Sequence, residues 1–234
     1  MFTDIFSTFD PATSSLFSSW STSLFWASNF LVIFIVQASL WTSPSQLSWS
    51  LLLPTDIMAT QVNRTNGARI KGLNSLLTPL FLFMLLINLT GILPYVFSAS
   101  SHFLFSLTFG FPLWLSLILS AAVYNPSWFT AALLPPGSPS VLNPFLACVE
   151  AISTLIRPLT LSLRLTANMT AGHVILTLIS IYTVWGIMDL PIYSALLMVS
   201  ISVFYTIFEM IVCLIQAYVF CLLLSLYADE HPTS

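Results

Sequence analysis

The last third of the chain contains two helix-compatible stretches of unusual length, which limit the possible folds more than any other feature. They cover about residues 144–182 and 192–227, with Asp189, Leu190 and Pro191 between them. At 1.5 Å per residue, a helix of roughly 39 residues is about 58 Å long, twice the thickness of a bilayer's hydrocarbon core. Neither stretch contains a cluster of turn residues that would divide it. We therefore expect a hairpin of two long, steeply tilted helices, the first kinked at Pro158.

Composition places these helices in a membrane. Hydrophobic residues make up 57% of the chain and charged residues only 6%, against roughly 25% charged residues in an average globular protein. A membrane β-barrel is disfavoured, because its strands alternate in polarity, whereas residues 80–86 (LFLFMLL) are apolar on every side. The sequence therefore predicts an all-α integral membrane protein. The net charge of −3 gives no electrostatic basis for binding nucleic acid.

We expect about five transmembrane helices in a single membrane domain, residues 1–234. Residues 1–71 hold a first span at about 24–41, a mixed segment at 43–58 that suits a helix lying on the membrane surface, and a basic loop at 63–71. Residues 72–140 hold spans at about 75–97 and 103–124, followed by a proline-rich connecting loop. Residues 141–234 hold the long hairpin.

Basic residues predict the orientation. Three of the five lie in one short loop: Arg64, Arg69 and Lys71. The positive-inside rule places this loop on the inner side of the membrane. With five crossings, the N-terminus then lies outside and the C-terminus inside.

Two charged residues stand within the hairpin. Arg164 keeps its charge at any physiological pH, and placing it in a bilayer costs several kcal/mol. Glu209 is the only acidic residue between Asp189 and Asp229. Ionisable groups inside a membrane usually mark ion pathways, so the pair predicts a transport role.

Helical spacing sorts the polar residues into three stripes. The first long helix carries an ionic stripe within about 80° and a hydroxyl and imidazole stripe on the opposite face, and the second carries one stripe. Their members are Glu150, Thr154, Arg157, Arg164 and Asn168; Ser162, Thr166, Thr170, His173 and Thr177; and Ser202, Tyr205, Glu209, Cys213 and Gln216.

Structural explanations compete with transport. Hydroxyl groups in membrane helices mostly mediate packing. Glu150 and Arg157 could lie near a membrane surface with their charges in water. Arg164 and Glu209 could form a buried ion pair with no other role.

Soluble-enzyme motifs are absent from the sequence. It contains no glycine-rich phosphate loop and no paired metal ligands, and its three cysteines lie apart in apolar runs. We therefore expect no metal or cofactor, and no enzymatic activity of the chain alone.

Two runs of the hairpin resemble subunit a of the rotary (F-type) ATP synthase. They are residues 156–173, with IRPL and LRLTANMTAGH, and residues 209–227, with LIQAYVF and LSLY. Residues 88–94 (NLTGILP) and 112–114 (PLW) support them. The RLTAN motif resembles the sequences of the mitochondrial, organelle-encoded branch of the family.

This resemblance implies a proton-translocating stator subunit facing a rotating c-ring. It implies that Arg164 is the essential charge between two half-channels, with His173 and Glu209 on the intermembrane-space side and Glu150 on the matrix side. Further residues that it implicates are Asn168 and Gln216, which flank the arginine, and the secondary candidates Arg157 and Tyr205.

The resemblance also implies partners and a location. The partners would be the c-ring, the peripheral stalk, small membrane subunits of the synthase, protons and membrane lipid. The chain would lie in the mitochondrial inner membrane, with its N-terminus in the intermembrane space and its C-terminus in the matrix.

Two alternatives remain open. A stand-alone secondary transporter often shows inverted repeats and broken helices, and no convincing repeat is visible here. A structural subunit of another respiratory membrane complex would use its charges only to pair helices.

Overall fold

The computed structural model describes Phe9 and residues 46–93, 98–134, 142–189 and 191–231. The expected first span at 24–41 lies outside the described residues. Four described helices are long and apolar enough to cross a membrane: α3 (Leu73–Ile92), α4 (Phe103–Tyr124), α6 (Asn143–Asp189) and α7 (Ile192–Asp229). They correspond to the other four expected crossings, and the all-α membrane class is confirmed.

Shorter helices lie before and between these spans. They are α2 (Gln46–Arg64), the 3-10 turns η2 (Asn66–Arg69) and η3 (Ala99–Ser101), and α5 (Pro126–Ala132). The segment expected to lie on the membrane surface is thus a helix, and it extends to Arg64.

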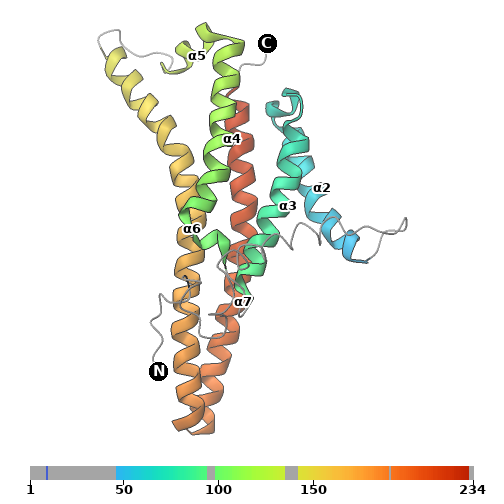
Figure 1. Ribbon diagram of the computed structural model, residues 1–234, viewed down its shortest axis with the longest axis vertical. Helices are drawn as coiled ribbons and strands as arrows, with labels where there is room; N and C mark the ends of the chain where they lie inside the picture. The colour runs from blue at the N-terminus through green and yellow to red at the C-terminus, as the bar shows by residue number, and fades with distance from the viewer. Residues whose placement is uncertain (1–8, 10–45, 94–97, 135–141, 190, 232–234) are drawn as a thin grey trace, which may run out of the picture.

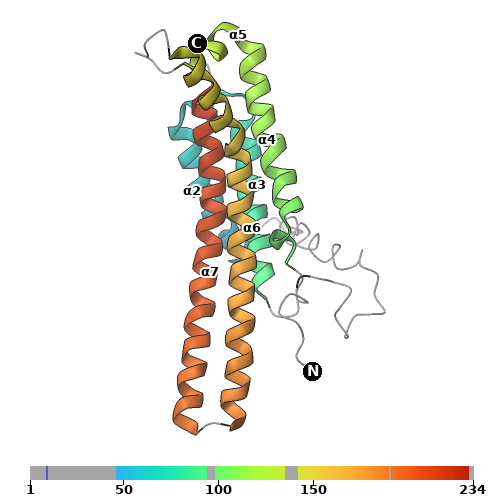
Figure 2. The ribbon, with the colours of Figure 1, turned by 90° about the vertical axis from the view of Figure 1, so that its left-hand side faces the viewer.

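The long hairpin is present as expected, and its first arm is longer than expected. α6 has 47 residues and α7 has 38, and the two run side by side in both ribbon views (Figures 1 and 2). The first turns of α6 lean away from the rest of the helix (Figure 1). Pro158 lies inside α6 and removes one backbone hydrogen bond, which explains a bend.

One loop expectation was wrong and one helix limit was too long. The proline-rich connection contains α5, because Asn125 accepts a hydrogen bond from the Trp128 amide at 3.3 Å and Pro126 occupies the first turn. α3 ends at Ile92 instead of residue 97. A proline at 94 disfavours helical backbone at the residue before it.

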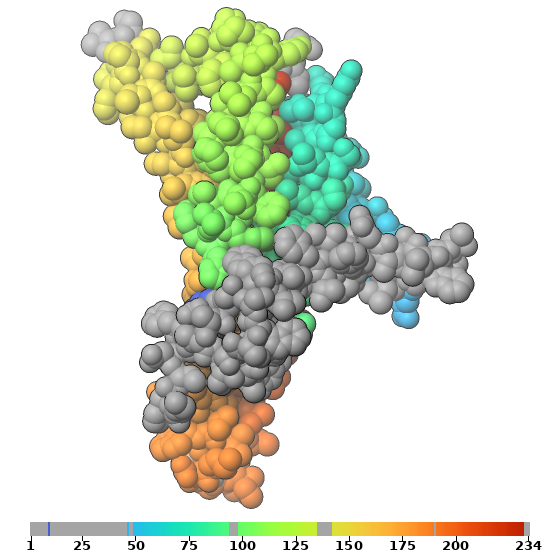
Figure 3. All heavy atoms as spheres, in the orientation of Figure 1, coloured from blue at the N-terminus to red at the C-terminus, as the bar shows by residue number. Residues whose placement is uncertain are grey.

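The two ends of the molecule differ. One end, which we call the tail end, holds η2, α5 and the end of α7. Of the described residues, those at the other end, the turn end, belong to the adjoining ends of α6 and α7 (Figure 1). These ends of α6 and α7 extend beyond the other described helices in the space-filling view (Figure 3).

The core lies toward the tail end, where α2, α3 and α4 cover the hairpin. Its fully or almost fully buried members include Met58 and Val62 of α2, Leu77, Phe81 and Met84 of α3, Leu161 and Leu165 of α6, and Ala217, Phe220 and Leu224 of α7. This packing holds α6 and α7 in one register, and the register positions the polar residues described below.

The basic loop is tied directly to the end of α7. The Gly67 amide donates to Asp229 Oδ1 at 3.1 Å. A Cβ on Gly67 would lie 2.8 Å from the Ala228 Cβ and 3.1 Å from Leu73 Cδ2. The basic loop and the end of α7 therefore lie together at one end of the described structure.

We expect Gly67→Val to loosen this tie, because its side chain would meet Ala228 at less than contact distance. Overpacking of this kind costs about 1–3 kcal/mol. The midpoint of thermal denaturation of the purified complex should fall. Ala68→Val, at the neighbouring exposed position, is the matched control, and an equal effect of both substitutions would contradict the prediction.

Candidate functional site

Arg164 lies on the outward face of α6. Its side chain is exposed, as are Leu163 and Leu159 beside it. Among the residues that the structure describes, no carboxylate lies within 4.0 Å of its guanidinium. The structure therefore does not pair Arg164 with Glu209.

Asn168 and Gln216 meet across the hairpin one turn from Arg164. The Asn168 amide donates to Gln216 Oε1 at 2.9 Å. Gln216 is buried, at 6% exposure. This bond joins α6 to α7 and fixes both amides beside the arginine.

Glu209 lies farther toward the turn end, buried between the two long helices. Its carboxylate packs against Gly172 so closely that a Cβ at position 172 would overlap it. Tyr205, one turn earlier on α7, interacts with the same carboxylate. Cys213 Sγ contacts Met169 Sδ at 3.3 Å. The polar stripe of α7 thus faces α6.

His173 follows Gly172 in α6 and lies on the helix face next to the one that contacts Glu209. The ring of Phe9 stands edge-on to it, with centroids 6.2 Å apart. Its Nε2 is buried and has no hydrogen-bond partner among the described residues. A buried polar atom without a partner is costly unless water or another group satisfies it.

The hydroxyl stripe of α6 packs, in part, against α4. Ser106 Oγ donates to the Ser162 carbonyl at 3.1 Å and lies 2.8 Å from Thr166 Oγ1. At these positions the packing explanation holds.

A group of buried polar residues that we did not expect from the sequence lies beside the helix of His173. Asn88 of α3 and Ser100 of η3 are each 0% exposed. Both amide atoms of Asn88 and the Ser100 hydroxyl have no hydrogen-bond partner in the described part of the chain. Gly91, one turn after Asn88, lies against Met169 of α6. The signal in the sequence was a lone amide within an apolar run.

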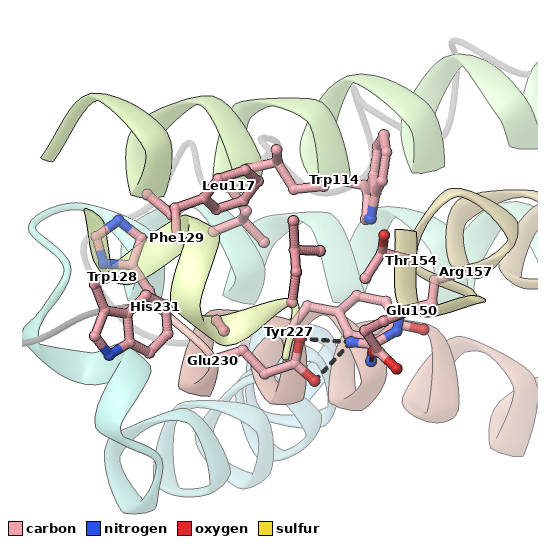
Figure 4. Close-up of a pocket in the computed structure, with 14 residues that line it drawn as sticks. Trp114, Leu117, Trp128, Phe129, Glu150, Thr154, Arg157, Tyr227, Glu230 and His231 are labelled. Carbon is pink, nitrogen blue, oxygen red and sulfur yellow. Dashed lines mark hydrogen bonds and ion pairs between the residues drawn. The ribbon is translucent and has the colours of Figure 1, made fainter. Parts of the chain in front are cut away.

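A second ionic group stands at the tail end. Arg157 donates to Glu230 Oε1 at 2.6 Å and to Oε2 at 2.5 Å, and its Nη2 lies 3.6 Å from Glu150 Oε1. Its guanidinium also stands 5.4 Å from the centre of the Tyr227 ring. These residues line a cavity of about 360 Å³ with side chains of α4 and α5 (Figure 4). The part that Glu230 takes was not expected.

The ionisable residues therefore form a series along the hairpin. Glu150 precedes Arg164 by about 21 Å of helix, and His173 follows it by about 14 Å, at 1.5 Å per residue. Arg164 stands between an acidic group at the tail end and a second group of Glu209 and His173 toward the turn end.

This arrangement defines a class, a helical membrane protein with protonatable groups on both sides of one exposed cation. A family model described as "ATP synthase A chain" matches residues 16–229. Curated proteins named "ATP synthase subunit a" are similar over 233 residues, 98% of this chain and 99% of each relative. They include those of Aedes aegypti (37% identical) and Anopheles gambiae (38%). The Drosophila melanogaster protein of the same name is 36% identical over the same shares.

The chain belongs to the ATP synthase subunit a family. The resemblance inferred from the hairpin runs is confirmed. The chain is thus a membrane-sector, proton-translocating subunit without enzymatic activity of its own. The stand-alone transporter and the structural subunit of another complex are not favoured.

We expect Gly172→Ala to displace the Glu209 carboxylate, because the added methyl group and the carboxylate cannot occupy the same space. Proton-driven ATP synthesis per assembled complex should fall. Gly110→Ala is the matched control, since a Cβ there would meet atoms only at 3.7 Å and beyond. Unchanged synthesis in an assembled Gly172→Ala complex would show that the position of Glu209 does not matter.

Proposed function

We propose that Arg164 separates two proton half-channels and faces the c-ring of the ATP synthase. This proposal is supported mainly by the exposed guanidinium on the outward face of α6, which has no carboxylate of the described residues beside it. A permanent cation on such an apolar face calls for an anionic partner from another chain.

The surroundings of Arg164 suit a rotor that presents carboxyl groups. Leu159, Leu163 and Ile156 are exposed on the same part of α6, at 46%, 45% and 47%. An apolar helix of the ring could pack on these residues while its carboxylate meets the guanidinium. Glu209 is a poor substitute, because it packs against Gly172, two turns away.

The chemistry of arginine matches this position. Its charge favours the ionised form of a carboxylate that comes close, so a ring carboxyl would release its proton there. Arginine cannot itself be deprotonated in proteins. It therefore cannot pass a proton directly from one half-channel to the other.

We assign one half-channel to the turn end and the other to the tail end. His173, Glu209 and Tyr205, with the buried Asn88, provide protonatable or hydrogen-bonding groups on the turn side of Arg164. Glu150 provides the carboxylate on the tail side. Asn168 and Gln216 would keep the region next to Arg164 polar and rigid.

Orientation follows from the basic loop. Arg64, Arg69 and Lys71 are exposed at the tail end, so the positive-inside rule assigns this end to the matrix and the turn end to the intermembrane space. The chain then lies in the mitochondrial inner membrane with its C-terminus in the matrix. Residues 1–234 form one membrane domain beside the peripheral stalk and small membrane subunits.

Replacing Arg164 with alanine should abolish proton-driven ATP synthesis in the assembled complex, because a ring carboxylate loses its counterion. Arg164→Lys should restore little, since a buried lysine loses its proton readily. Synthesis and passive proton leak are measured together in sealed inner-membrane vesicles.

Arg69→Gln, which removes an exposed loop charge, serves as the matched control and should leave synthesis near the wild-type level. Coupled synthesis that persists in Arg164→Ala would reject the proposed role of this residue.

A further inference from the structure

At the tail end, one cation contacts two carboxylates, one through short hydrogen bonds and the other at a longer distance. Glu230 receives two short hydrogen bonds from Arg157, at 2.6 and 2.5 Å. Glu150 has a single contact with Arg157 Nη2, at 3.6 Å. A contact of that length is beyond ordinary hydrogen-bond range. Glu230 therefore holds the guanidinium, and Glu150 is only weakly paired.

The two carboxylates come from the two arms of the hairpin, at its open end. Glu150 lies near the start of α6, whereas Glu230 immediately follows α7. The Arg157 guanidinium also lies over the ring of Tyr227. Figure 4 shows Glu230 and Arg157 joined at one wall of the cavity, with Glu150 beside them.

The cavity in front of this group has a polar wall and an aromatic wall. Thr154 joins the ionic residues on α6, whereas Trp114, Trp128 and Phe129 come from α4 and α5. The Glu150 side chain is 40% exposed, so solvent can reach its carboxylate.

We propose that Glu230 is a positioning residue that occupies Arg157 and thereby leaves Glu150 free to gain and lose a proton at this cavity. The proposal rests on the proposed function, in which Glu150 belongs to the matrix half-channel. If Arg157 formed the paired bonds with Glu150 instead, it would strongly favour the ionised carboxylate. A carboxylate fixed in that form would take up protons poorly.

Few other ionisable groups face Glu150. Besides Arg157 and Glu230, the cavity contains Tyr227 and His231, and the His231 ring stands 6.0 Å from the ring of Tyr124 on α4. The side chains that α4 and α5 contribute to the cavity are not ionisable. The competition therefore concerns mainly two carboxylates and one guanidinium.

Two substitutions should act in opposite directions. With Glu230→Gln, Arg157 turns to Glu150 and stabilises its ionised form. The alkaline limb of ATP-driven proton pumping should then move to lower matrix-side pH. With Arg157→Gln, Glu150 loses its cation and faces Glu230, so the limb should move to higher pH. For partly exposed pairs we expect shifts of about half a pH unit.

The measurement uses the complete complex in inverted inner-membrane vesicles, where the matrix face meets the buffer. Pumping is followed over a range of external pH and divided by the amount of assembled complex. Glu230→Asp keeps the charge and should retain the wild-type profile.

If Arg157 and Glu230 only hold the ends of the two helices together, a different result is expected. Both neutral variants would then reduce assembly alike, and neither would move the pH limb. Shifts of the same sign, or none, would overturn the proposal. If Glu230→Gln prevents assembly, Glu230→Ala takes its place, because it also frees Arg157 for Glu150 and should move the limb to lower pH. An unmoved limb in an assembled Glu230→Ala complex would overturn the proposal.

The outcome separates this proposal from the function on which it rests. Wild-type vesicles that pump with variants that do not shift would reject the role of Glu230 and leave the half-channels in place. Wild-type vesicles that fail to pump would reject the proposed function itself.

Discussion

The structure depends on a close, polar contact between two very long helices. Glu209, Cys213 and Gln216 are buried against α6, and the absence of a side chain at Gly172 lets the carboxylate fit there. The same register leaves the Arg164 side chain exposed. One packing arrangement thus buries the acid, joins the amides and exposes the base. In the function that we propose, this separation leaves the arginine available to a carboxylate of another chain.

Much of the hairpin could be predicted because its signals are local. Pro191 marks the break between α6 and α7, and the lack of turn residues within each stretch indicates a continuous helix. The 3.6-residue spacing places Asn168 on the same helix face as the other members of its stripe. The contact between Asn168 and Gln216 could not be derived, because it joins residues 48 positions apart and depends on the register between α6 and α7.

Features that depend on tertiary contacts or on helix capping could not be predicted, or were overlooked. The prolines of the connection concealed α5, although Asn125 and Pro126 are ordinary signals for starting a helix. The burial of Asn88 arises only when η3 folds beside α3 and α6. Glu230 was missed because its partner, Arg157, is 73 residues away.

The length of α6 has a consequence for how deep any water path has to be. Its 47 residues correspond to about 70 Å of helix, more than twice a bilayer's apolar thickness. Such a helix must tilt or protrude. In a tilted helix, groups well separated along the axis are displaced sideways as well as in depth. Two water-filled paths, each open to one membrane surface and reaching only part of the way across, could then lead to different positions on a rotating ring.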